Sequence, residues 1–183
     1  MYDYVIIHGS FGSPFENWSP WLFNILSEKG KQVLAPQLPT IEQNYHNWDM
    51  VFSVYDQFVG KNTSFIAHSL GPAFVLDYLV KHQKQVKNLY FIAPFYGLIK
   101  IKEFDDVNRT FFIYPDISIA KPFFKSAWCL FSDNDPYVPI TMSKDIADQL
   151  SANTMIIPGG KHINASAGFT EFRELLNVIE EHE

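Results

Sequence analysis

The chain has 183 residues, which is enough for one compact domain with a sizeable core. Hydrophobic residues make up 47% of it and charged residues 19%, a balance typical of a folded globular protein and not of a disordered one. The formal net charge of −6 and the lack of any basic run argue against nucleic acid or an anionic membrane as a partner, because both attract clustered Lys and Arg.

The first residues, 1–7, are predicted to form a strand and not a signal peptide, since no positive segment precedes a long apolar stretch. No apolar run approaches the roughly 18 residues of a membrane span, so none is expected. The single cysteine, Cys129, has no partner for an internal disulfide, which fits a reducing compartment. The sequence therefore predicts a cytoplasmic location.

Short apolar, β-branched or aromatic runs alternate with longer segments of helical period. The predicted strands are Tyr2–Ile7, Gln32–Ala35, Thr63–Ala67, Val86–Ile92, Ala127–Phe131 and Thr154–Ile157. The predicted helices are Trp18–Lys29, Tyr45–Val59, Ala73–Lys81, Thr141–Leu150 and Gly168–Glu181. This alternation indicates parallel βαβ units, and the continuous apolar runs indicate strands that are covered on both faces. We expect an α/β protein in one domain over 1–183, with a compact, doubly wound, mainly parallel six-stranded sheet, flanking helices and no large cap domain.

One region, Phe95–Phe124, is longer than an ordinary connection and rich in aromatic residues. Short helices near Ile99–Asp106 and Ile117–Phe124 fit its pattern. Two interpretations stay open. The segment is either a small lid-like insertion over the sheet or aromatic core that packs at the sheet edge.

The central motif is the stretch 65–73, in which an apolar strand ends at Ala67 and a helix follows a tight turn at Ser69. A sharp strand-to-helix turn of this kind, a nucleophile elbow, holds a catalytic serine in a strained backbone conformation. Small residues are needed two positions before and after the serine, and here they are Ala67 and Gly71. The alternative is a serine that only caps the helix. The strand before it, the helix after it and the partners downstream favour the nucleophile.

A carboxylate and a histidine follow the elbow in the chain order that such sites require. The strand ending at Phe131 leads into Ser132-Asp133-Asn134-Asp135-Pro136, so Asp133 and Asp135 compete for the role of the acid. Asp135 is favoured because Pro136 fixes the local backbone and an Asp-x-x-Val-Pro pattern follows. Asp133 is the alternative, with a side chain that could instead organise the turn.

The histidine of the predicted site is His162, which follows the last strand and a turn containing one proline and two glycines. An imidazole there can remove the serine proton and later protonate the leaving group. His68 is expected to point away from the nucleophile. The remaining histidines show no metal-ligand spacing, so we expect no metal and no cofactor.

Acyl transfer also needs two N–H donors for the developing oxyanion. One is expected from the backbone of Leu70, directly after the serine. The second is expected from the glycine-rich loop His8–Ser13, and either Ser10 or Phe11 can supply it. A nucleotide-binding interpretation of this loop is disfavoured, because its glycine spacing matches no phosphate-binding fingerprint.

Several of these motifs together resemble a compact α/β-hydrolase family of small serine hydrolases, typified by retinoblastoma-binding protein 9 and the bacterial YdeN type. The resemblance rests on His8-Gly9, Asn17-Trp18 with Trp21, Trp48, Ala67-His68-Ser69-Leu70-Gly71, Asp135-Pro136-Tyr137-Val138-Pro139 and Gly160-Lys161-His162. It covers nearly the whole chain, and the Asn-Trp-x-x-Trp stretch is its most family-specific part.

The resemblance implies triad roles for Ser69, Asp135 and His162 and hydrolysis of a small-molecule ester or amide. The sequence departs from the family at Lys161, where a glycine often stands, and at Phe95–Phe124, which has no clear match. The expected activity is therefore that of a carboxylesterase-like serine hydrolase working through an acyl-enzyme. The alternatives are an acyltransferase or thioesterase with the same triad, and a non-catalytic protein-binding module whose partner the sequence does not identify.

Overall fold

The structure is a computed structural model that describes residues 1–183. Its centre is a six-stranded, entirely parallel sheet in the order β2-β1-β3-β4-β5-β6. The strands are β1 (Tyr4–Ile7), β2 (Val33–Leu34), β3 (Ser64–His68), β4 (Asn88–Ile92), β5 (Ser126–Ser132) and β6 (Asn153–Ile157). The predicted α/β class, the doubly wound topology and the six-stranded sheet are confirmed.

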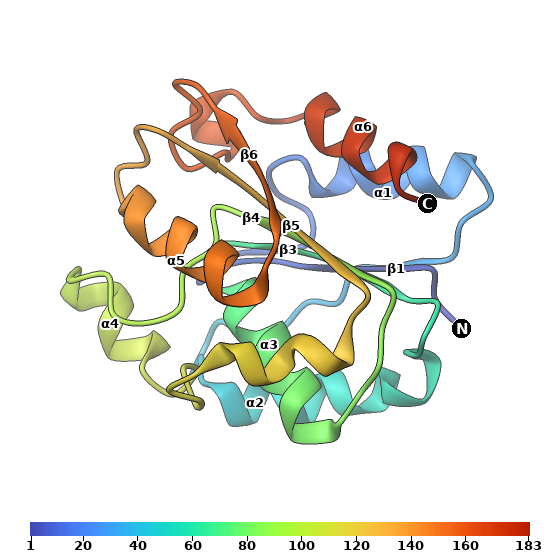
Figure 1. The fold of residues 1–183 in the computed structure, drawn as a ribbon, viewed down its shortest axis with the longest axis horizontal. Coiled ribbons are helices and arrows are strands. Elements are labelled where there is room, and N and C mark those ends of the chain that lie inside the picture. The colour runs from blue at the N-terminus through green and yellow to red at the C-terminus, as the bar shows by residue number, and fades with distance from the viewer.

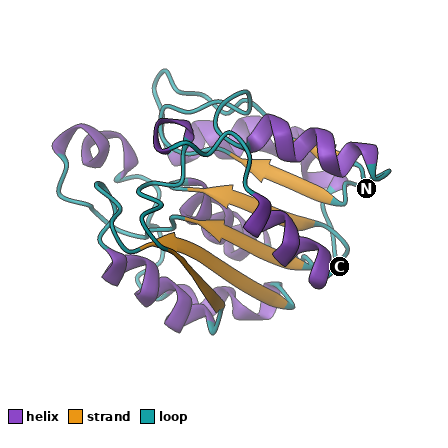
Figure 2. Ribbon diagram, turned by 90° about the horizontal axis from the view of Figure 1, so that it is seen from above, coloured by secondary structure: helices purple, strands orange, loops and turns teal.

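Helices cover both faces of the sheet (Figures 1 and 2). One face packs against α1 (Ser19–Glu28) and α6 (Arg173–Glu181), and the other against α2 (Tyr45–Phe52), α3 (Gly71–His82) and α5 (Ile140–Leu150). None of the helices is long and apolar enough to cross a membrane.

Successive strand residues point to opposite faces of the sheet, and each face has its own apolar cluster. In β1, Val5 and Ile7 join the cluster under α2, α3 and α5, whereas Tyr4 and Ile6 join the one under α1 and α6. Because both faces are covered, all four of these side chains are apolar or aromatic and buried. This explains why the strands read as continuous apolar runs in the sequence.

Two helix predictions were too long. The segment predicted as Tyr45–Val59 leaves the α-helix after Phe52 and continues as a 3₁₀ helix over Ser53–Phe58. The last helix begins at Arg173 and not at Gly168. Gly168 has a φ of 93° and ends a short 3₁₀ turn, so the chain reverses before the helix starts. The aromatic spacing of Phe169 and Phe172 imitates a helical stripe, but their rings pack on each other edge to face at 5.3 Å.

The segment Phe95–Phe124 contains α4 (Lys102–Asn108) and a 3₁₀ helix over Ile117–Phe123. Its two parts do different things. Phe111, Ile117 and Ala120 belong to the core, whereas Phe104 in α4 lines a cavity at the carboxyl edge of the sheet. Figure 1 shows α4 projecting beyond the main body of the fold.

The chain runs from β1 outward to β2 and then returns to β3, on the other side of β1. Loops at the carboxyl ends of β1 and β3 therefore leave the sheet in opposite directions. In open α/β sheets this switch point is where ligands bind.

Candidate active site

Ser69 lies at this switch point, on the turn between β3 and α3. Its φ of 60° places a non-glycine residue in the left-handed region, which costs on the order of 1–3 kcal/mol. The turn is held because the Ser69 N–H donates to the carbonyl of Ile92, at 2.9 Å, in the neighbouring strand. This conformation turns the serine side chain away from the sheet and toward the cavity.

The small residues around the serine are required by close backbone approach. A Cβ on Gly71 would lie 2.9 Å from the carbonyl oxygen of Ile7, and one on Gly9 would lie 2.8 Å from the Cβ of Ser69. Both distances are shorter than real Cβ contacts allow. The first loop of the chain is thus packed directly against the turn that carries the serine.

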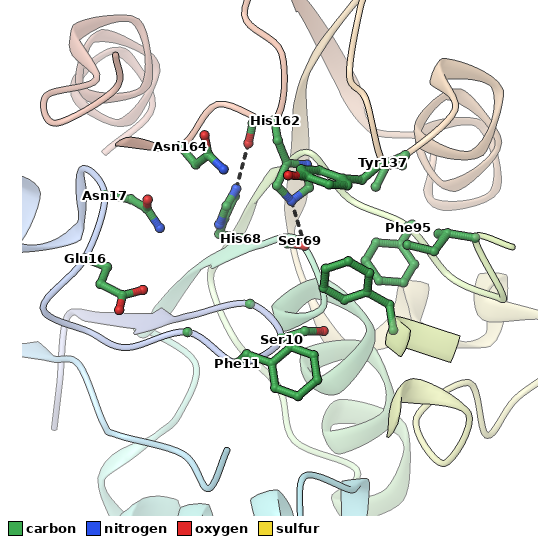
Figure 3. Close-up of a pocket in the computed structure, with 15 residues that line it drawn as sticks. Ser10, Phe11, Glu16, Asn17, His68, Ser69, Phe95, Tyr137, His162 and Asn164 are labelled. Carbon is green, nitrogen blue, oxygen red and sulfur yellow. Dashed lines mark hydrogen bonds between the residues drawn. The ribbon is translucent and has the colours of Figure 1, made fainter. Parts of the chain in front are cut away.

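The three side chains predicted for the triad form a hydrogen-bonded row. Ser69 Oγ lies 2.9 Å from His162 Nε2, a hydrogen bond marked by a dashed line in Figure 3, and His162 Nδ1 lies 2.7 Å from Asp135 Oδ2. Since a carboxylate only accepts, the proton on the imidazole sits on Nδ1 and leaves Nε2 free to accept from the serine. The other Asp135 oxygen accepts from the backbone N–H groups of Tyr137 and Val138, at 2.8 and 3.1 Å.

The neighbouring aspartate has a different place. Asp133 Oδ1 accepts the N–H of Gly159, at 2.8 Å, and Asn134 Oδ1 accepts the N–H of Lys161 at the same distance. Both bonds attach the loop after β5 to the turn before His162. Of the two competing aspartates, the structure brings only Asp135 to the imidazole.

The loop that carries His162 is strained and externally supported. Lys161 and Ile163, on either side of the histidine, have φ values of 48° and 50°. The indole Nε1–H of Trp18 donates to the carbonyl of Ile163 at 3.1 Å, and Asn17 Oδ1 accepts the N–H of Ala165 at 2.8 Å. Asn17 and Trp18 therefore hold the histidine loop in position, and this contact is the structural role of the Asn-Trp motif.

His68 does not point away from the site, contrary to the expectation from the sequence. It lines the cavity, and its Nε2–H donates to the carbonyl of His162 at 2.9 Å. Burial and the neighbouring His162 lower the pKa of His68 to about 3, so the ring is neutral. It is the last residue of β3, and alternation along the strand directs it to the face of α1, where Trp18 packs edge to face on it.

The backbone donors near Ser69 differ in their availability. The N–H of Phe11 donates to Gln43 Oε1 at 2.8 Å, whereas the N–H groups of Ser10 and Leu70 have no acceptor within the protein. Of the two residues left open for the second oxyanion donor, the geometry favours Ser10.

Gln43 and Asn108 support this loop and were not singled out from the sequence. Gln43 Nε2 donates to Asn108 Oδ1 at 2.7 Å, and the Ser10 hydroxyl donates to the same oxygen at 2.9 Å. Both amides are buried. They lie 65 positions apart in ordinary polar contexts, so no local pattern marks them.

The cavity above Ser69 has a volume of about 200 Å³. Loops that follow β1, β3, β4, β5 and β6 contribute its walls, which include Phe95, Ile99, Val138 and Asn164. No group of three His, Cys, Asp or Glu side chains is arranged to hold a metal ion. The chemistry available from its own residues is thus a hydroxyl beside an oriented imidazole and two free N–H donors.

Comparison with known proteins identifies similar sequences and structures. A family model described as serine hydrolase matches residues 4–181. The YdeN protein of Bacillus subtilis (strain 168) is 28% identical over 178 residues, which cover 95% of this chain and 92% of that protein. The crystal structure of the B. subtilis ydeN gene product matches with a TM-score of 0.89 at 24% identity and covers 100% of this chain and 98% of that one.

More distant structures share the architecture. Est1E from Butyrivibrio proteoclasticus, solved with ferulic acid bound, matches with a TM-score of 0.74 at 18% identity, over 98% of this chain and 88% of that one. Alpha/beta hydrolase domain-containing protein 10 from mouse matches with a TM-score of 0.67 at 16% identity, over 96% of this chain and 86% of that one. These likenesses show the α/β-hydrolase fold.

Proposed function

Because the chain belongs to the serine hydrolase family, we propose that it cleaves a carboxylic ester or amide of a small substrate with Ser69 as nucleophile, His162 as general base and Asp135 as the acid that orients the histidine. The observation that carries the proposal is the continuous row from the Ser69 hydroxyl through the imidazole to the Asp135 carboxylate. The unusual backbone conformation of Ser69 adds support, since strain of this kind concentrates at functional positions.

The proposed reaction has two steps. Ser69 Oγ attacks the carbonyl carbon while its proton passes to His162 Nε2, and the resulting oxyanion accepts hydrogen bonds from the N–H groups of Leu70 and Ser10. His162 then gives the proton to the leaving alcohol or amine, which departs and leaves an acyl group on Ser69. A water molecule attacks this acyl-enzyme as His162 takes its proton, and His162 then returns that proton to Ser69 Oγ as the bond to the acyl group breaks and the carboxylic acid leaves.

Asp135 acts through the imidazole. By accepting Nδ1–H it keeps the tautomer that can receive the serine proton, and its negative charge stabilises the imidazolium that forms. Its second oxygen is fixed by two backbone N–H groups, so the carboxylate does not have to reorganise as the charge appears.

The apolar part of the cavity suggests an acyl chain as one substituent of the carbonyl. We expect kcat/KM for p-nitrophenyl esters to rise from acetate to butyrate to hexanoate, because Phe95, Ile99 and Val138 offer buried apolar surface beside the serine. Replacing Ser69 by Ala should lower turnover at least about 10³-fold. Equal rates across the series would contradict the apolar acyl site, and an active Ser69→Ala protein would contradict the mechanism.

A further inference from the structure

The cavity around Ser69 is divided into two chemically different halves. On one side are six aromatic or aliphatic side chains: Phe11, Phe95, Ile99, Phe104, Tyr137 and Val138. Three of their rings form a continuous arc, since Phe104 lies 5.9 Å from Phe11 and 5.9 Å from Tyr137 between ring centroids. In Figure 3 the labelled aromatic residues Phe95 and Tyr137 lie on the opposite side of Ser69 from Glu16 and Asn17.

The other half carries side-chain amides with fixed orientation. Asn17 Oδ1 accepts from the backbone N–H of Ala165, and Asn164 Oδ1 accepts from that of Ala167, at 2.8 and 3.2 Å. These hydrogen bonds to the amide oxygens fix the orientation of both side chains. The NH₂ group of each residue has no partner in the protein and is free to donate. This side of the cavity thus presents two hydrogen-bond donors whose positions are set by the chain.

His68 adds an acceptor to the same half. Its Nε2 faces a carbonyl oxygen and must therefore carry the proton, so the neutral ring has a lone pair on Nδ1. No protein donor reaches that nitrogen, and the ring forms part of the cavity wall.

Glu16 is the one formally charged side chain of the cavity wall. It is exposed, makes no ion pair and accepts no side-chain hydrogen bond, although it lies among polar groups. Figure 3 shows its carboxylate turned toward the middle of the cavity, below His68 and Asn17. The residue also borders a groove of about 500 Å³ between the first loop and residues 37–41, so the polar half is open to a group that extends outward.

Nearby titratable groups do not neutralise this carboxylate. The pKa of His8, whose charge would interact with Glu16, is lowered by burial, so its ring is uncharged. Its Nε2 accepts the N–H of Leu38, and its Nδ1–H donates to the carbonyl of Gly9, at 3.0 and 2.8 Å. The negative charge of Glu16 is therefore available to a ligand.

We infer that the site selects an amphipathic substrate, in which the scissile carbonyl joins an apolar group, held by the aromatic half, to a short cationic group, held by Glu16. This inference rests on the proposed function and specifies its substrate class. The positive charge lies against the Glu16 carboxylate and the His68 lone pair, and the amide NH₂ groups of Asn17 and Asn164 are donors for an oxygen atom where the substrate carries one on this side. Glu16 is thus a specificity residue and takes no part in bond making.

A matched pair of esters tests the role of charge. The hexanoyl esters of choline and of 3,3-dimethylbutanol have the same shape and differ in a quaternary nitrogen against a carbon. The kcat/KM ratio of the two esters is divided by the ratio of their rates of alkaline hydrolysis, which corrects for their different intrinsic reactivity. We expect this corrected ratio to favour the choline ester by about fivefold, which is the effect of one partly solvated ion pair. The preference should shrink as salt is raised, because added ions screen an exposed carboxylate.

Substitutions of Glu16 test whether its carboxylate causes the preference for the choline ester. Glu16→Gln should bring the corrected ratio close to one, and Glu16→Lys should reverse it. Glu28→Gln, which removes another exposed glutamate at the end of α1 and outside the cavity, should keep the wild-type ratio.

Three results would overturn the inference: a wild-type ratio near one, a preference that survives in Glu16→Gln, or an equal loss in Glu28→Gln. A wild-type protein that hydrolyses neither ester but still reacts with a fluorophosphonate at Ser69 would reject this substrate class alone. Failure of Ser69 to react at all would reject the proposed function with it.

Discussion

Two aspartates only two positions apart illustrate how strongly the site depends on single residues. Asp135 contacts the imidazole, whereas Asp133 accepts a backbone hydrogen bond from the turn before His162. Both side chains come from the same loop after β5, and both end within reach of the histidine loop. Only one of them is placed to influence the proton on Nδ1.

This difference predicts unequal effects of two identical substitutions. Asp135→Asn should lower kcat for p-nitrophenyl butyrate on the order of 10³–10⁴-fold, because an amide facing Nδ1 no longer enforces the required tautomer. Asp133→Asn retains an oxygen acceptor for the Gly159 N–H, so its kcat should fall less than about tenfold. A larger loss in Asp133→Asn than in Asp135→Asn would contradict the assignment, with circular dichroism as the check that both variants fold.

At the scale of elements, the loops that carry the site residues are held in place by side chains from other segments of the chain. Trp18 and Asn17, just before α1, hold the loop after β6. Gln43, before α2, and Asn108, at the end of α4, hold the loop after β1. The serine turn alone is supported by the sheet itself. The geometry of the proposed site is thus set by contacts between segments that are distant in the chain.

The Phe95–Phe124 segment is attached to α3 by a buried carboxylate. The Tyr96 hydroxyl donates to Asp77 Oδ1 at 2.6 Å, and the backbone N–H of Tyr114 donates to the same hydroxyl at 2.9 Å. Asp77 is fully buried, and desolvation raises its pKa to about 7, well above the ordinary value of 3.8.

This raised pKa predicts a pH dependence of stability. The folded protein holds a proton on Asp77 that the unfolded chain releases above about pH 4, so the free energy of unfolding should fall as pH rises from about 4 through 7. Asp77→Asn removes this effect. From pH 5 to pH 8, its free energy of unfolding should improve relative to wild type by about 2.5 kcal/mol in urea titrations. Parallel pH profiles of the two proteins would contradict the prediction, and Asp145→Asn, on the surface of α5, is the control.

At the scale of the whole molecule, the sequence was sufficient to predict those elements that a local residue pattern determines. The four central strands, β1, β3, β4 and β5, could be predicted because both faces of the sheet are covered there and most of their residues are apolar and buried. The serine turn could be predicted because a strand leads into a helix there and close backbone approach demands glycine at position 71. The predicted start of α6 was wrong because Phe169 and Phe172 have the spacing of a helical stripe, although they lie in a loop and pack on each other.

Other features depend on contacts that no local pattern encodes. The preference for Ser10 over Phe11 as the proposed second oxyanion donor rests on a buried glutamine, which accepts the N–H of Phe11 and leaves that of Ser10 free. The dual character of Phe95–Phe124 follows from its attachment to both the core and the cavity. Glu16 is an ordinary exposed glutamate in the sequence, and only the folded chain places it opposite the aromatic wall.

The central claim is that Ser69 is an activated nucleophile, and intact-protein mass spectrometry after reaction with a fluorophosphonate tests it most directly. A phosphonate on Ser69 Oγ mimics the tetrahedral species that the site is proposed to stabilise. We predict one adduct per folded chain, located at Ser69 by peptide mapping, and none on Ser69→Ala or on the unfolded wild type. An unlabelled wild type, or equal labelling of Ser69→Ala, would contradict the account.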